Sequence, residues 1–82
     1  MAKTAMAKTA MSKQLVVCVK NDGFLVSLER RKIYVALPDA QAEKNGMTRV
    51  VDESGEDYLY PSKLFRAILL PVALKRAILD AA

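Results

Sequence analysis

Histidine is missing from this chain of 82 residues. Without it there is no imidazole to act as a general base or to bind a metal ion. No glycine-rich loop that could bind phosphate is present, and Ser12, Ser27, Ser54 and Ser62 have no recognisable activating partner. An enzyme is therefore the least expected class of protein, and we expect no catalytic residue, no cofactor and no metal site.

Cysteine occurs once, at Cys18, which excludes an internal disulfide and a zinc site built from cysteines. It lies in the apolar run LVVCV, so we expect a buried thiol that packs as a small hydrophobic side chain. A chain without disulfides fits the reducing cytoplasm, which is the predicted location. No apolar run approaches the ~20 residues of a membrane span, and no membrane partner is expected.

Positive charge is concentrated at the start of the chain. The net charge is +4, but residues 1–13 contain three lysines and no acid, which leaves ten bases and nine acids in the remainder. The body is therefore not a basic domain of the kind that follows a phosphate backbone. Because MAKTA is repeated and lacks the apolar core of a signal peptide, we predict a disordered, duplicated segment over 1–13. Residues 14–82 are predicted to form a single small domain.

Short β-strand patterns follow the first segment. The run QLVVCVK over 14–20 is apolar and β-branched, as in a buried strand, and the turn residues NDG come after it. FLVSLE over 24–29 predicts a second strand, and IYVALP over 33–38 predicts another after the charged RRK. Alternation predicts which side chains face the core. They are Phe24, Val26 and Leu28 in the strand over 24–29, and Ile33, Val35 and Leu37 in the strand over 33–38.

The second half of the chain adds a short helix and further strands. DAQAEKNG favours one helical turn, capped by Asp39 and closed by Asn45 and Gly46. MTRVVDE and DYLYP predict two more strands, SKLF a one-turn connector, and RAILLP a last strand with Ala67 and Leu69 on one face.

The end of the chain predicts a helix over 71–82, because Pro71 suits a helix start and an apolar stripe follows it. Such a helix could cover one open end of a sheet. Five to six short strands with tight turns and one terminal helix indicate a mostly β (β+α) fold, a small antiparallel SH3-like barrel.

The order of elements resembles an SH3-type barrel, in which a one-turn connector like SKLF precedes the final strand. More narrowly, KIYVALPD…GMTRVVDESGEDYLYP is similar to a family of small bacterial proteins, over about half the chain. The matching region runs from about Ser27 to Leu70. This resemblance implies an SH3-like fold and no catalytic residues. The chain departs from the pattern at SLERRK, where arginines replace the expected glycine-containing turn.

The run DESGED, residues 52–57, has four carboxylates in six residues. Our preferred interpretation is a hairpin turn at Ser54-Gly55, flanked by solvated charges. A second interpretation is structural, with Asp57 or Glu56 paired to Arg49 or Lys32. A metal site is the least favoured interpretation, because the acids lack the regular spacing of a calcium loop.

Three tyrosines lead to the candidate binding surface. Tyr58 and Tyr60 share one face of their strand, and Leu59 occupies the other. If Leu59 is in the core, both tyrosines are exposed beside Tyr34 and offer a large contact area to a ligand. Alternatively, one tyrosine packs in the core with its hydroxyl satisfied at the rim. The candidate binding residues are Arg30, Arg31, Lys32, Tyr34, Tyr58 and Tyr60.

These residues suggest two functions. The leading hypothesis is a non-enzymatic protein-interaction module, or a small homo-oligomeric adaptor or regulator, that binds a protein partner or its own copy. The alternative is a nucleic-acid-binding barrel, in which Arg30, Arg31 and Lys32 contact phosphate and bases stack on Tyr34.

Overall fold

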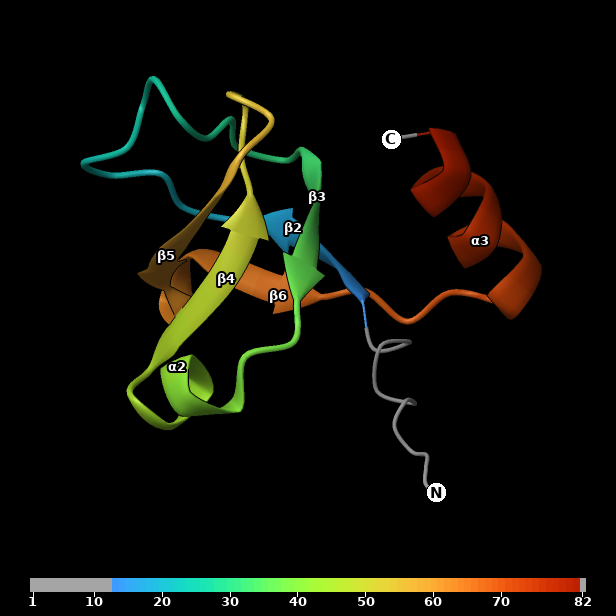
Figure 1. Cartoon of the computed structure of the whole chain (residues 1–82). Coiled ribbons are helices and arrows are strands. Elements are labelled where there is room, and N and C mark those ends of the chain that lie inside the picture. The colour runs from blue at the N-terminus through green and yellow to red at the C-terminus, as the bar shows by residue number, and fades with distance from the viewer. Residues whose placement is uncertain (1–12, 82) are drawn as a thin grey trace.

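A computed structural model describes residues 13–81 (Figure 1). The predicted N-terminal segment therefore lies outside the described residues, apart from Lys13. In chain order the elements are β2 (Gln14–Cys18), β3 (Ile33–Leu37), α2 (Ala40–Lys44), β4 (Met47–Val51), β5 (Asp57–Pro61), the 3₁₀ helix η1 (Ser62–Leu64), β6 (Phe65–Ala67) and α3 (Val72–Ala81).

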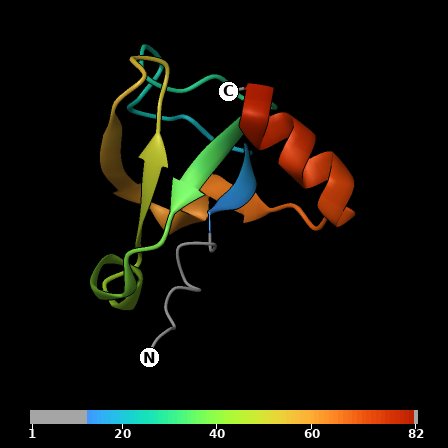
Figure 2. The same cartoon turned by 45° about the vertical axis from the view of Figure 1, so that its right-hand side comes forward.

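The five strands form one antiparallel sheet in the order β5-β4-β3-β2-β6, which curls into a half-barrel (Figures 1 and 2). The two edge strands, β5 and β6, follow one another in the chain and are joined by η1. The predicted class is confirmed: the fold is mostly β with a C-terminal helix, and its architecture is consistent with a small SH3-like barrel.

The core lies on the concave face of the sheet. Residues paired across antiparallel strands point to the same face, so the pairs Val16–Tyr34 and Cys18–Phe65 belong to one layer. Cys18 is fully buried there, as predicted. The whole buried cluster consists of Val16, Cys18, Leu28, Tyr34, Ala36, Val50, Tyr60, Leu64 and Phe65.

The predicted facing of β3 is wrong. Tyr34 and Ala36 are buried, whereas Ile33 is 41% exposed and Val35 is half-buried on the convex face. The cause is that β3 is apolar on both faces, so alternation alone could not choose between them. Its register with β2 decides the matter, because Val16 lies opposite Tyr34.

The predicted strand over 24–29 is also wrong. The amides of Ser27 and Leu28 both donate to the carbonyl of Phe24, at 3.1 and 2.9 Å, and the segment forms a turn. Phe24 packs against the core and Leu28 is buried, but Val26 is 94% exposed. Phe24 and Leu28 are four residues apart, a spacing that places both on one face of a strand or of a single helical turn. Only the exposure of Val26 between them distinguishes the turn from the strand. β2 already has strands on both sides, so it leaves no edge for this segment.

The other local predictions are mostly confirmed. Asp39 caps α2 by accepting a hydrogen bond from the amide of Ala42 at 3.0 Å, and Gly46 closes the turn with a φ of +73°. The connector SKLF forms η1. The last strand is shorter than predicted, because it ends at Ala67 and leaves Leu69 outside the sheet.

The predicted C-terminal helix is confirmed as α3, which lies beside the β2–β3 side of the sheet in both views (Figures 1 and 2). None of its residues is buried, although Lys75, Ile78 and Leu79 are half-buried. The helix therefore contributes no fully buried side chain. Over residues 13–81, no helix has the length and apolar character needed to cross a membrane.

Candidate functional site

The loop between β2 and β3 and the hairpin between β4 and β5 lie at the same end of the sheet (Figures 1 and 2). A backbone hydrogen bond joins them, donated by the Glu53 amide to the Ser27 carbonyl at 3.1 Å. A depression of about 430 Å³ lies between the two segments. We call it the hairpin pocket, and it is lined by Phe24, Ser27, Asp52, Ser54, Tyr58, Leu59 and Tyr60.

The DESGED run forms the tip of the hairpin, which confirms the predicted turn. The Asp52 amide donates to the Glu56 carbonyl and the Gly55 amide donates to the Asp52 carbonyl, each at 3.0 Å. Gly55 has a φ of +86°, which favours glycine. The Ser54 amide and hydroxyl both donate to Asp52 Oδ1, at 2.8 and 2.6 Å. This Asx-turn bends the Asp52 side chain back over the turn.

Structural pairing accompanies the turn. Arg49 bridges Asp39 and Asp57, with both nitrogen–oxygen distances at 3.0 Å. Lys32 pairs with Glu53 rather than with Glu56 or Asp57. Among residues 13–81, no three acidic, cysteine or histidine side chains gather as a metal site would require.

Asp52 is the one buried charged residue of the described chain, at 7% exposure, so its prediction as a solvated charge is wrong. Burial acts to raise the pKa of its carboxyl group, but hydrogen bonds from Ser54 and Tyr60 outweigh burial and lower the pKa. The carboxylate is therefore ionised at neutral pH. No ion pair within residues 13–81 includes Asp52, so hydroxyl and amide donors alone compensate its charge.

Tyr60 forms the aromatic part of the pocket. Its ring is buried and meets the edge of Phe24 at a centroid distance of 5.1 Å, and its hydroxyl donates to Asp52 Oδ2. Burial, followed by this hydrogen bond, raises the pKa of Tyr60. The alternative in which one tyrosine packs in the core with its hydroxyl at the rim is thus confirmed for Tyr60. Tyr58 is 50% exposed and donates to Glu56, and Leu59 is exposed rather than in the core.

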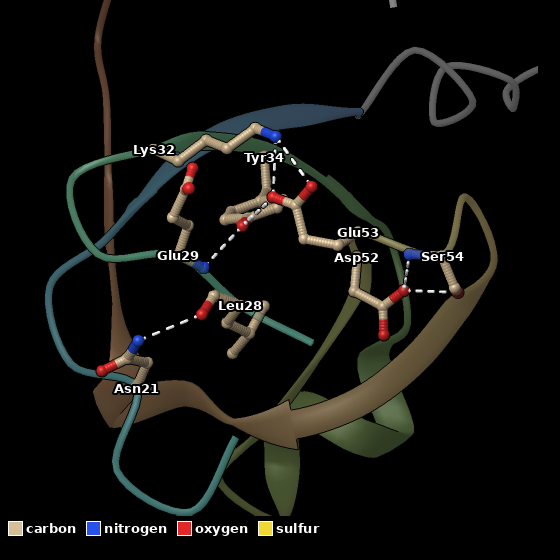
Figure 3. A network of polar contacts seen from close by, with 8 residues as sticks. All are labelled: Asn21, Leu28, Glu29, Lys32, Tyr34, Asp52, Glu53 and Ser54. Carbon is tan, nitrogen blue, oxygen red and sulfur yellow. Dashed lines mark hydrogen bonds and ion pairs between the residues drawn. The ribbon is translucent and has the colours of Figure 1, made fainter. Parts of the chain in front are cut away.

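Tyr34 is a structural residue (Figure 3). Its hydroxyl accepts a hydrogen bond from the Glu29 amide at 2.7 Å and donates to Glu53 at 2.5 Å. Lys32 pairs with the same Glu53 carboxylate at 2.7 Å. Burial, with the Glu53 hydrogen bond as the next cause, raises the pKa of Tyr34. The network holds the β2–β3 loop against the hairpin, and Asn21 closes the loop by donating to the Leu28 carbonyl.

The six predicted binding residues do not form one surface. Arg30, Arg31 and Lys32 are exposed, and Tyr58 is half-exposed, but the rings of Tyr34 and Tyr60 are buried. A base therefore has no access to the Tyr34 ring for stacking. The prediction failed because it treated these tyrosines as one row, whereas Tyr34 and Tyr60 point into the core.

Sequence analysis missed five pocket residues, which are Phe24, Ser27, Asp52, Ser54 and Leu59. One signal was available: an aspartate two residues before a serine is typical of an Asx-turn, which would have turned Asp52 inward. The exposure of Leu59 carried no such signal.

No match was found in comparisons with protein-family models, with curated proteins or with solved structures. The resemblance to a family of small bacterial proteins thus stays a prediction.

Proposed function

We propose that this chain is a non-catalytic protein-interaction module, and that the hairpin pocket receives its partner. The carrying observation is a pair of exposed aliphatic residues, here called the rim, in the loop that lines the pocket. Leu25 and Val26 stand between the lining residues Phe24 and Ser27 and are 75% and 94% exposed. Folding gains nothing from two aliphatic side chains left in water beside an aromatic pocket, whereas a partner that covers them gains from their burial.

The shape of the site supports a peptide as the partner. About 430 Å³ is near the lower end of the range for ligand pockets, roughly 300–1,000 Å³, so the pocket suits one or two side chains. A pocket for alternate side chains beside a sheet edge is typical of peptide recognition. The adjacent strand β5 is such an edge.

Self-association is the second form of the same proposal. The segment after β6 exposes Leu69, Val72 and Leu74, and the convex face of the sheet exposes Ile33. A second copy that covered these side chains would make the chain a small homo-oligomeric adaptor or regulator.

The nucleic-acid alternative keeps the exposed Arg30 and Arg31 but loses Tyr34 as a stacking residue. Lys32 is already paired with Glu53. Phosphate binding by the two arginines remains testable, since it must weaken steeply with salt.

Selection from a display library of random peptides on the immobilised chain tests the proposal. Peptides enriched by the native chain should lose binding to the double variant Leu25→Ser/Val26→Ser, whose melting temperature should be unchanged because both side chains are exposed. The matched control is Leu69→Ser, an aliphatic residue equally exposed but outside the pocket. This control should bind as the native chain does.

Two results would overturn the proposal. One is the absence of any enriched peptide, and the other is equal binding by the rim variant and the native chain. A titration with DNA and RNA in parallel tests the alternative. Binding that falls by orders of magnitude between about 50 and 200 mM salt, and that Arg30→Glu/Arg31→Glu removes, would favour nucleic acid.

A further inference from the structure

We infer that the hairpin pocket binds the guanidinium group of an arginine side chain in the partner peptide, with Asp52 as its counter-ion. This inference rests on the proposed function and adds the chemical class of the ligand. It depends on three features of the pocket: a buried carboxylate on Asp52 that no cation of the described chain pairs with, aromatic and aliphatic walls, and an unbalanced negative charge.

The first feature is the hydrogen bonding of Asp52. An ionised carboxylate offers about four acceptor positions. The structure fills two on Oδ1 from Ser54 and one on Oδ2 from Tyr60. The backbone amide of Asp52 is a further donor, so hydroxyl and amide groups surround the carboxylate and no cation of residues 13–81 pairs with it. Asp52 is 7% exposed and lines the pocket.

The second feature is the wall around that oxygen. Phe24, Tyr58 and Leu59 line the pocket with Asp52, and Phe24 stands at right angles to Tyr60. A guanidinium group is planar and weakly hydrated, stacks on aromatic rings and donates to carboxylates. An ammonium group is more strongly hydrated and suits this mixed wall less well. The pocket thus matches arginine in both its apolar and its polar parts.

The third feature is local charge. Glu53 pairs with Lys32 and Asp57 shares Arg49 with Asp39, but within residues 13–81 neither Asp52 nor Glu56 forms an ion pair. Glu56 does not line the pocket itself, but it accepts the hydroxyl hydrogen bond of the lining residue Tyr58 at 2.9 Å. The pocket therefore repels a phosphate or carboxylate ligand and attracts a cation.

Two synthetic peptide mixtures provide the probe. Both are acetylated and amidated random sequences with one fixed position, which is arginine in the first and citrulline in the second. Citrulline has nearly the shape of arginine without its charge. With the chain labelled with nitrogen-15, the arginine mixture should shift the amides of Ser54, Tyr58 and Leu59. The citrulline mixture should bind about 10- to 100-fold more weakly, the effect of losing a charged hydrogen bond.

Asp52→Asn should remove the difference in binding strength between the arginine and citrulline mixtures. Asp80→Asn is the control for this variant. Asp80 is exposed on α3, so its variant makes the same change in net charge far from any pocket contact. The comparison of arginine with citrulline on the native chain needs no variant. It therefore remains decisive if Asp52→Asn does not fold.

The outcomes separate the two proposals. Equal shifts at the pocket with both mixtures would overturn the arginine inference and leave the interaction module standing. No shift with either mixture would overturn both. A third outcome is that the chain forms a dimer that Asp52→Asn abolishes, and that no peptide binds. This outcome would overturn the peptide as the ligand, and the occupant of the pocket would be an arginine of a second copy.

Discussion

Tyr60→Phe isolates the hydrogen bond on which the pocket depends. The substitution removes one hydroxyl from a buried ring and keeps the ring itself, so Phe24 and Phe65 retain their edge contacts. Asp52 then loses the hydrogen bond that Tyr60 donates to its Oδ2. A hydrogen bond to a charged group contributes about 1.5–3 kcal/mol, so the free energy of unfolding should fall by that amount.

Urea denaturation and thermal melting measure this loss. For a chain of this size, about 1 kcal/mol corresponds to roughly 4–8 °C, so the melting temperature should fall by at least about 6 °C. The control is Tyr58→Phe, which removes the same hydroxyl two residues away in the same strand. Because the Tyr58–Glu56 bond is exposed, its loss should leave the melting temperature nearly unchanged.

The pH dependence gives a second test of the same bond. The pKa of Asp52 is lowered in the folded chain from its ordinary value of 3.8, so the unfolded chain binds more protons as the pH falls past that value. The stabilisation by Asp52 is thus present above about pH 4 and is lost as the pH falls through the folded pKa. The difference between the native chain and Tyr60→Phe should accordingly be largest near neutral pH and shrink in acid.

Equal losses of stability in Tyr60→Phe and Tyr58→Phe would refute this reasoning. They would show that the burial of Asp52 does not strengthen its hydrogen bond with Tyr60. A difference that is unchanged in acid would refute it as well, since the bond would then not depend on the ionised carboxylate.

Three further predictions concern the loop and the core. Arg31 has a φ of +71°, a backbone conformation that is strained for a residue other than glycine, so Arg31→Gly should raise stability by about 0.5–1 kcal/mol in urea denaturation. Arg30→Gly is the control and should lower stability. A loss of stability in both variants would contradict backbone strain at Arg31. Cys18 is fully buried, and burial raises the pKa of its thiol. Thiol reagents should therefore react with it at a rate that rises with the urea concentration. Fast labelling in native buffer would contradict the burial of Cys18. Lys32→Met should leave the melting temperature nearly unchanged, because the ion pair of Lys32 with Glu53 is exposed. A clear fall in the melting temperature would contradict this expectation.

Local chemistry made much of the fold predictable. The cap at Asp39, the turn at Gly55, η1 and α3 each depend on neighbours within a few residues in the chain, and all four were identified correctly. The site was less predictable. Asp52 belongs to a run of charges that looks uniformly solvated, and its burial follows from contacts with Tyr60, eight residues away.

The sequence by itself determined the class of the fold and the absence of histidine and disulfide chemistry, because composition and local hydrogen bonding suffice for both. Tertiary structure alone decided which face of β3 is buried, because both faces are apolar and only the pairing of Val16 with Tyr34 fixes the register. It likewise decided that Phe24 and Leu28 lie in a turn, because their spacing suits a strand and a turn equally. The pocket is also a product of tertiary structure, since Phe24 and Ser27 of the loop meet Asp52 and Tyr60 only when the loop closes on the hairpin.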